Sequence, residues 1–209
     1  MASIQWQNEA TKQRVEALVR EIESKSSAEI VVTVRPFSGN YRAADLTVAS
    51  ILAFFMLTVY VYAPTEFTDD LAPPSILLTF FAGLFCAARV PALRRIFSPK
   101  SVKQANVRDA AASAFVDQGI SCTRDRTGIL IYISRLERRA EIVADIGILR
   151  RQGEGEPDAA IAEIKRVIEA GEDLETFEKA VRRLGVFLTE NLPPRLDDQN
   201  ELADEVNVA

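Results

Sequence analysis

The stretch LTVASILAFFMLTVYVYA, residues 46–63, decides how this chain is organised, because its 18 positions carry no charged side chain. A helix of this length is close to what the hydrocarbon core of a bilayer requires. A second uncharged run, LAPPSILLTFFAGLFCAA at 71–88, follows after the short acidic link PTEFTDD. The two runs predict a transmembrane hairpin that returns the chain to the side it left.

The alternative interpretation is a buried helical hairpin of a water-soluble protein. A buried helix in a domain of this size normally shows a polar face, and neither run has one. Tyr60 and Tyr62 near the end of the first run, and Pro64 after it, are typical of an interfacial anchor and a helix end. Neither run contains an ionisable residue of the kind that marks an ion pathway, which disfavours a transporter or channel.

The distribution of Lys and Arg predicts the orientation of this hairpin. The link has no Lys or Arg, whereas Arg35 and Arg42 precede the first run and a basic cluster follows the second. Basic flanks stay in the cytoplasm, so both termini are expected there. Four residues of the cluster are also predicted to contact lipid headgroups, although setting the topology is a sufficient role for them: Arg94, Arg95, Lys100 and Lys103.

The remaining segments predict one α/β domain. With the hairpin removed, a strand, a helix and a strand follow one another, which gives a parallel strand pair. A helical hairpin has its ends close together, so it can be inserted into this connection. Amphipathic helices are expected at 9–25, 98–119, 156–171 and 173–194, and strands at 28–34, 127–134 and 140–148, the last two forming a hairpin.

These elements divide the chain into four parts. Residues 1–45 and 91–192 are expected to form the two parts of the cytoplasmic domain, and 46–90 the transmembrane hairpin. The acidic tail 193–209 has no periodicity and is predicted to be disordered.

Three stretches of the sequence resemble a known family. AEIVVTVRPFSGNYRAADL, TRDRTGILIYIS and ERRAEIVADIGI, with two apolar helices after the first, are similar to the TPM domain. The likeness covers roughly residues 9–206 and is strongest to bacterial membrane proteins that carry two transmembrane helices within this domain. It implies an α/β/α sandwich around a small mixed sheet, in the bacterial inner (plasma) membrane.

The resemblance does not imply a settled activity. Chloroplast members look tied to photosystem repair, some members have been credited with acid phosphatase activity, and an animal member looks like an auxiliary subunit of a receptor channel. Members often have His after the D-x-G-I strand end and Trp in the next helix. This chain has DIGILRRQGEGEPDAAIAE there and no histidine at all, so an activity that needs that imidazole is not expected.

Three carboxylates are candidate ligands for a divalent cation. Asp145 lies at the end of the third predicted strand, and Glu29 and Asp125 are the expected partners. Carboxylate oxygens suit hard cations such as Mg²⁺ and Ca²⁺. The structural alternative is that Asp145 caps a turn and Glu29 is an exposed charge at a sheet edge.

A phosphate site is the second candidate for chemistry. Thr127 and Gly128, with Arg124 or Arg126, can present N–H groups and a guanidinium to a phosphate. The alternative is a turn before the strand that is held by Arg–Asp pairs. The absence of histidine excludes a Ser-His-Asp triad, and Cys122 is more consistent with a packed residue than with a reactive thiol.

Small residues in the second apolar run predict a close helix contact. Ala82, Cys86 and Ala87 are expected to make it, within the hairpin or with another membrane protein. The sequence therefore predicts a non-catalytic scaffold or auxiliary factor whose partners are the lipid bilayer and other integral membrane proteins, with no cofactor. The alternative is a low-activity phosphatase dependent on a divalent cation. The lack of a basic stripe with interleaved aromatics argues against nucleic acid as a partner.

Overall fold

The computed structural model describes residues 4–63, 69–150, 156–194, 201–202 and 206–208. The chain forms two compact units. One consists of residues 1–38 and 104–209 and is called the α/β unit. The other, residues 39–103, is called the hairpin unit and extends beyond the predicted bounds 46–90 on both sides.

A mixed sheet forms the centre of the α/β unit. Within the described residues its strand order is β3-β2-β1-β4. Strand β1 (Glu29–Arg35) pairs in parallel with β2 (Gly128–Ser134), and β3 (Arg139–Ala144) pairs antiparallel with β2. The predicted parallel strand pair and the predicted β-hairpin of β2 and β3 are both confirmed. Their register places Glu29 beside Gly128 at one end of the sheet.

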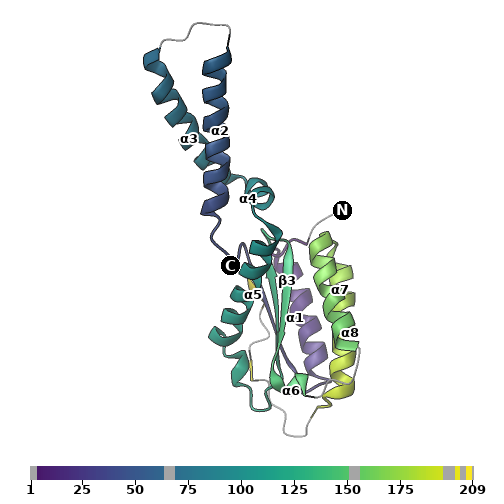
Figure 1. Ribbon diagram of the computed structural model, residues 1–209. Helices are drawn as coiled ribbons and strands as arrows, with labels where there is room; N and C mark the ends of the chain where they lie inside the picture. The colour runs from purple at the N-terminus through teal and green to yellow at the C-terminus, as the bar shows by residue number, and fades with distance from the viewer. Residues whose placement is uncertain (1–3, 64–68, 151–155, 195–200, 203–205, 209) are drawn as a thin grey trace. The chain divides into compact units, whose positions relative to one another are not determined.

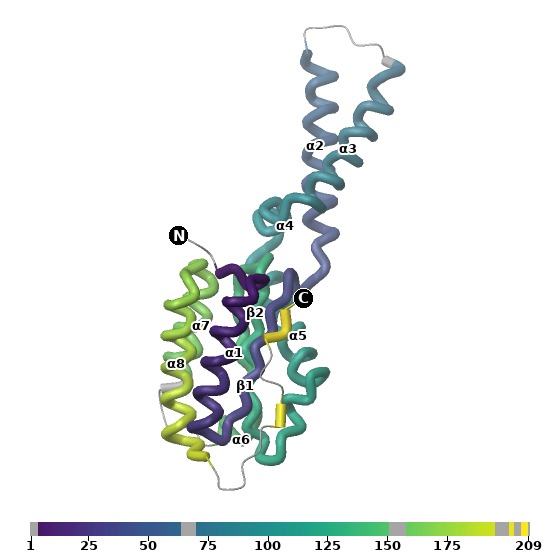
Figure 2. Tube along the Cα trace, turned by 180° about the vertical axis from the view of Figure 1, so that it is seen from behind, coloured from purple at the N-terminus to yellow at the C-terminus, as the bar shows by residue number. Residues whose placement is uncertain are grey.

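Three helices cover one face of this sheet (Figures 1 and 2). They are α1 (Glu9–Glu23), α7 (Glu156–Ala170) and α8 (Leu174–Asn191). Alternate residues of a strand point to opposite faces, so one set from β1 and β2 meets these helices. The resulting core includes Ile30, Val32, Val34, Ile129, Ile131 and Ile133 from the sheet and Val15, Leu18, Val19, Ile164, Val181, Leu184 and Leu188 from the helices. Trp6 also belongs to it and packs edge-on against Phe177, with ring centroids 5.2 Å apart.

The opposite face of the sheet is covered by α5 (Lys100–Asp117) and the short 3-10 turn Ile120–Cys122. The second, smaller core consists of Val107, Ala111, Phe115, Ile120, Val31, Leu130 and Tyr132. Helices therefore lie on both faces of the sheet, which confirms the predicted α/β class and fits the layered sandwich.

The third strand is shorter than predicted. It ends at Ala144, and residues 146–149 form the short helix α6 (Ile146–Leu149), so the prediction of a strand to 148 is wrong. Asp145 is the N-cap of this helix. A Cβ at Gly147 would lie 2.4 Å from the backbone oxygens of both Asp125 and Arg126. The chain turns here because only glycine allows the two backbone segments to approach so closely.

The acidic tail is not wholly disordered. Residues 195–200 and 203–205 lie outside the described residues, but β4 (Asn207–Val208) pairs in parallel with β1. Val206 is buried in the larger core, and the backbone N–H of Glu201 donates to Glu29 Oε1 at 3.2 Å. The prediction of disorder is therefore wrong for these residues. An open strand edge requires cover, and a two-residue strand is too short to show any periodicity.

Helices α2, α3 and α4, labelled in Figure 1, belong to the described part of the hairpin unit. Helices α2 (Arg42–Tyr62) and α3 (Ala72–Arg89) coincide closely with the two uncharged runs, and the 3-10 turn Asp69–Leu71 leads into α3. The short helix α4 (Pro91–Phe97) follows after Val90. Both long helices meet the length and composition of a membrane span.

Candidate functional site

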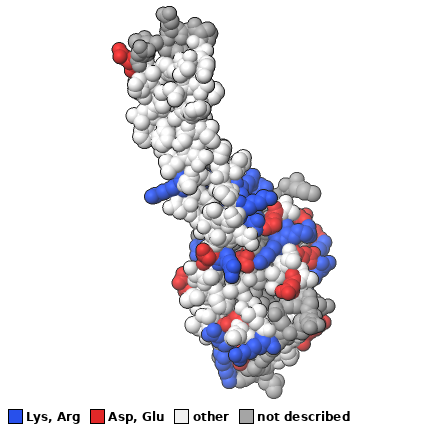
Figure 3. Space-filling model, viewed as in Figure 1, with Lys and Arg blue, Asp and Glu red and all other residues white. Residues whose placement is uncertain are grey.

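The most unusual surface of the molecule belongs to α2 and α3. Only 22% of the most apolar part of α2 and 11% of that of α3 are buried. Large apolar side chains are exposed on both helices: Phe54, Phe55, Leu57 and Val61 on α2, and Leu77, Leu78, Phe81 and Phe85 on α3. Figure 3 shows this part of the surface almost without charge. The core helix of a water-soluble protein would be mostly covered, and these two helices are not.

A seam of small residues joins α2 to α3. A Cβ at Gly83 would lie 2.8 Å from the Cα of Ala49, so the two backbones touch at this point. Ala49 and, one turn after Gly83, Ala87 are fully buried. Such close contacts of small residues are the usual means of packing helices in a bilayer.

The sequence analysis located this seam only in part. Burial within the hairpin is confirmed for Ala87, but Ala82 and Cys86 are exposed, and Gly83 takes their place. Gly83 and Ala87 are four positions apart and share one side of the helix, whereas Ala82 and Cys86 share the neighbouring side. For Ala82 and Cys86, a contact with another membrane protein stays a prediction.

A bidentate ion pair links α2 to α4. The guanidinium of Arg94 donates from Nε to Asp45 Oδ1 at 2.8 Å and from a terminal nitrogen to Oδ2 at 2.7 Å. The side chains are 28% and 12% exposed, so the pair is partly shielded from water. The hydrogen bonds to Asp45 raise the pKa of Arg94 above its ordinary value. Sequence analysis missed this pair, although Asp45 is the one acidic residue in 39–63.

The four predicted headgroup residues divide into two classes. Arg94 is held by Asp45, and the Lys103 ammonium donates to the backbone carbonyl of Arg95 at 2.8 Å. Lys100 is exposed and Arg95 is partly exposed. The prediction is corrected for Arg94, because its charge is used inside the protein.

The predicted metal ligands lie near one end of the sheet, and each of the three side chains already interacts with another residue of the protein. Asp145 is 5% exposed, and its Oδ1 accepts from the N–H of Ile146 at 2.7 Å. Its Oδ2 lies 3.0 Å from Arg126 Nε, as in an ion pair, at an angle unsuited to a hydrogen bond. Glu29 Oε1 accepts from Glu201, and Asp125 also has a partner. Among the described residues, no group of three or more Asp, Glu, Cys or His side chains can hold a metal ion.

Polar groups of the predicted phosphate turn likewise bind other residues of the protein. Thr127 donates its hydroxyl to the Ser27 carbonyl at 2.7 Å and its N–H to Thr123 Oγ1 at 3.2 Å. Arg126 pairs with Asp145, and the N–H of Arg124 donates to Glu201 Oε2 at 2.9 Å. This geometry matches the structural alternative, a turn held by an Arg–Asp pair. The phosphatase hypothesis gains no support from the described residues.

A buried polar cluster at the other end of the sheet holds the segment that leaves β1. Glu137 Oε1 accepts from the N–H of Ser38 at 2.8 Å, and Glu137 also accepts from the hydroxyl of Ser134. The hydroxyls of Ser38 and Tyr132 lie 3.1 Å apart. Burial raises the pKa of Tyr132, so it is neutral at physiological pH. The cluster fixes the chain where it departs for the hairpin unit.

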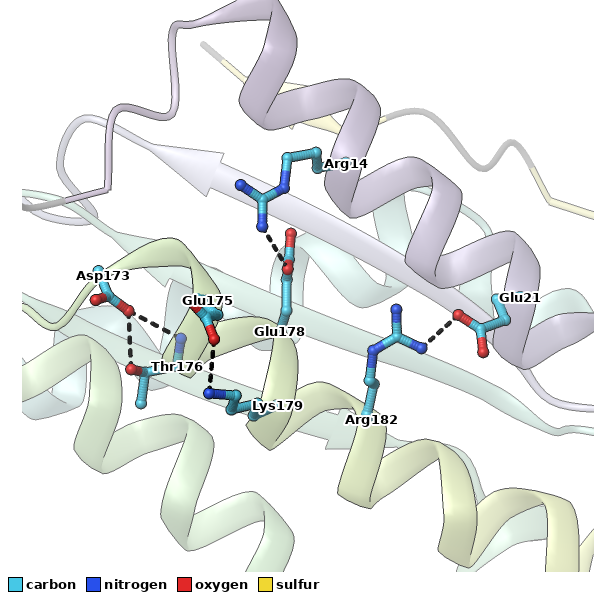
Figure 4. A network of polar contacts seen from close by, with 8 residues as sticks. All are labelled: Arg14, Glu21, Asp173, Glu175, Thr176, Glu178, Lys179 and Arg182. Atoms are coloured by element: carbon cyan, nitrogen blue, oxygen red, sulfur yellow. Dashed lines mark hydrogen bonds and ion pairs between the residues drawn. The ribbon is translucent and has the colours of Figure 1, made fainter.

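Surface ion pairs connect α1 to α8 in the α/β unit (Figure 4). Arg14 pairs with Glu178 at 2.7 Å, and Arg182 pairs with Glu21. Asp173, the N-cap of α8, accepts from the N–H and the hydroxyl of Thr176, and these bonds lower its pKa. The exposed ion pairs link the surfaces of α1 and α8 and contribute little to stability.

Comparison with known proteins adds information on the fold. No family model matches the chain, and no curated protein matches it. The NMR structure of the BA42 protein from the psychrophilic bacterium Bizionia argentinensis is similar, with a TM-score of 0.58 and 15% identity. The match covers 97% of this chain and 94% of that chain. At this identity the likeness supports the α/β fold alone, and the resemblance to the TPM domain stays a prediction.

Proposed function

We propose that this chain is a membrane-anchored protein of the TPM type, held in a bacterial inner membrane by the α2–α3 hairpin. Its α/β unit acts from the cytoplasmic face as a scaffold or auxiliary factor for other membrane proteins. The observation that carries the proposal is the exposed apolar surface of α2 and α3, with Phe54 at 70% and Leu78 at 72% exposure.

The free energy of transferring apolar side chains out of water favours lipid around the hairpin. Moving one exposed Phe or Leu side chain from water into an apolar medium gains about 1.5–3 kcal/mol. The exposed side chains of the hairpin together represent a gain on the order of 10 kcal/mol if lipid surrounds them. In water this free energy would not be gained, because these side chains are not covered by contacts within the hairpin unit.

Charge supports the proposed orientation. Helix α2 begins at Arg42 and α3 ends at Arg89, so basic residues mark one end of the hairpin. Asp69 and Asp70 lie at the connection between the helices. The positive-inside rule assigns the basic end to the cytoplasm, together with the α/β unit.

The two native cysteines allow a direct test of topology. In a Cys86→Ser variant, Cys122 is the one remaining thiol. Cys122 is exposed in the α/β unit, so the expectation of a packed residue is wrong. A membrane-impermeant maleimide should label Cys122 only after spheroplasts are permeabilised. A second variant, Thr65→Cys with both native cysteines replaced by Ser, places the thiol in the link and should label in intact spheroplasts. The reverse pattern would overturn the orientation.

The scaffold role requires its own experiment. A photo-crosslinking residue at Ala82, on the exposed side of α3, should capture another membrane protein in native membranes, and capture should disappear when detergent dissolves the membrane. The purified full chain should not hydrolyse a chromogenic phosphate ester with Mg²⁺ or Ca²⁺. Turnover that Asp145→Asn abolishes would favour the phosphatase instead, because Asn retains the N-cap while losing the charge.

A further inference from the structure

We infer that α4 lies in the membrane–water interface and binds the surface of anionic phospholipids through an exposed apolar side and three flanking cations. The inference rests on the proposed anchoring by α2 and α3. It goes further in assigning a second membrane contact, with a lipid preference, to residues 89–100.

The polarity of α4 is inverted relative to a helix that faces water. No residue of α4 is fully buried, and Ile96 is 70% exposed and Phe97 37% exposed. The charged Arg94 is turned inward to Asp45, with its side chain 28% exposed. A helix that exposes its Ile and turns one of its two Arg side chains inward is adapted to an apolar surrounding on its outer side.

The place of α4 in the chain supports an interfacial position. Helix α3 ends at Arg89, Val90 is extended, and α4 begins at Pro91. A single residue separates the end of the proposed span from α4, so the short helix must lie close to the headgroups. Val90, which precedes α4, is a further exposed apolar residue, with 43% exposure.

Three cations around α4 are not used by carboxylates among the described residues. Arg89 places its guanidinium over the Phe85 ring, 4.7 Å from the centroid, and Lys100 is exposed. Arg95 is partly exposed, and in the part of the chain that the structure describes its side chain makes no ion pair, while its backbone carbonyl accepts from Lys103. Asp45 is the one acidic residue in 39–63 and 71–103, and Arg94 occupies it. The surface therefore carries unneutralised positive charge that fits phosphate headgroups, and attraction of this kind depends on anionic lipid.

The ion pair between Arg94 and Asp45 has a defined part in this arrangement. It removes the one carboxylate that would repel a headgroup. It also fixes α4 so that Ile96 points away from α2, because Arg94 on the side that faces α2 is held at two points.

The test uses the full chain with Cys86→Ser, Cys122→Ser and Ile96→Cys, labelled with an environment-sensitive fluorophore. The protein is placed in nanodiscs of phosphatidylcholine alone or of equal parts phosphatidylcholine and phosphatidylglycerol. Emission should be blue-shifted and stronger in the anionic discs. The double variant Arg95→Gln with Lys100→Gln should lose at least about half of this difference. The control Arg108→Gln with Arg135→Gln, which removes two exposed cations of the α/β unit, should retain it.

The outcomes separate this inference from the proposed function. Equal emission in the two lipids, or a difference that the Arg95 and Lys100 variant leaves intact, would overturn the role of α4 while leaving the anchor standing. Emission typical of water in both discs would also overturn it and would direct the search to a protein partner. A chain that enters neither disc would contradict the anchor itself.

Discussion

The two units of this chain treat apolar side chains in opposite ways. The α/β unit places Ile, Leu, Val and Phe between its sheet and its helices, whereas the hairpin unit displays them and buries Gly83, Ala87 and Ala49. Water drives large residues inward in the first unit. A seam of small residues under exposed large ones is the pattern expected where lipid is the solvent. The contrast shows that the exposure of an apolar side chain has to be interpreted together with the solvent around it, water or lipid.

A charge placed on each exposed surface should produce the largest difference between the units. Phe54→Lys introduces an ammonium near the middle of α2 and should cost about 3 kcal/mol of insertion free energy. Cell fractionation should show loss of the chain from the membrane or its degradation. The matched control is Val186→Lys on α8, where Val186 is 58% exposed. A surface site in water tolerates this change to within about 0.5 kcal/mol. Equal tolerance at both sites would remove the distinction between the units.

Enlarging a residue in the seam should have the next largest effect. Gly83→Leu forces a side chain into the Cα of Ala49 and should reduce the stability of the detergent-solubilised chain by about 2 kcal/mol. Ala82→Leu, the neighbouring exposed position, should leave the thermal midpoint unchanged. In the α/β unit, Gly185→Ala is a useful comparison. Its new Cβ would meet a side chain rather than a backbone, 2.7 Å from Cγ1 of the buried Ile22, so this variant should also be destabilised. Similar losses for Gly83→Leu and Ala82→Leu would contradict the seam.

The ion pair of the hairpin unit should contribute more to stability than the ion pairs on the surface of the α/β unit. Asp45→Asn or Arg94→Gln should each cost about 1–3 kcal/mol, because each leaves a partly shielded charge without its partner. The double variant should cost less than the sum of the two, which measures the coupling. Removing Glu175 from its exposed pair with Lys179 should lower the unfolding midpoint much less, and salt should reduce even that effect. Strict additivity at Asp45 and Arg94 would mean that the pair is not formed.

The smallest expected effect is a pH dependence in the α/β unit. The native pKa of Asp173 is lowered by its bonds to Thr176, so the folded state binds this proton more weakly than the unfolded state. The contribution of ionised Asp173 to the free energy of unfolding is complete above the ordinary Asp pKa. It is lost as the pH falls through the lowered pKa of the native state. Circular dichroism melts should show the advantage of the wild type over Asp173→Ala shrinking in that acidic range. The side chain of Asp173→Asn caps the helix without titrating, so the stability of this variant relative to Asp173→Ala should not fall with pH. An equal fall for Asp173→Asn would mean that another group titrates.

Much of the fold could be predicted because its signals are local. The apolar runs gave α2 and α3, and the β-branched stretches gave β1 and β2. Features that depend on a distant segment were missed. Strand β4 forms by pairing with the distant strand β1, which its own short sequence does not indicate. The ion pair between Asp45 and Arg94 joins residues 49 positions apart.

The candidate site was predicted less well for a related reason. Residue type suggested Asp145 and Arg126 as parts of a metal or phosphate site, but their partners decide their role, and they bind each other. The same holds for the basic cluster, where Arg94 is an internal contact and Lys100 is exposed. Local sequence reports the charge of a side chain, but not whether another side chain already neutralises it.

Thiol reactivity at one site in each unit provides the most direct test of lipid around the hairpin. Phe54→Cys and Val186→Cys, each made in a chain lacking Cys86 and Cys122, replace side chains that are 70% and 58% exposed. In open membrane fragments, a water-soluble maleimide should modify the Val186→Cys variant and leave the Phe54→Cys variant unmodified until denaturing detergent is added. Equal modification of the two variants in the intact fragments would show water at α2 and would contradict the account.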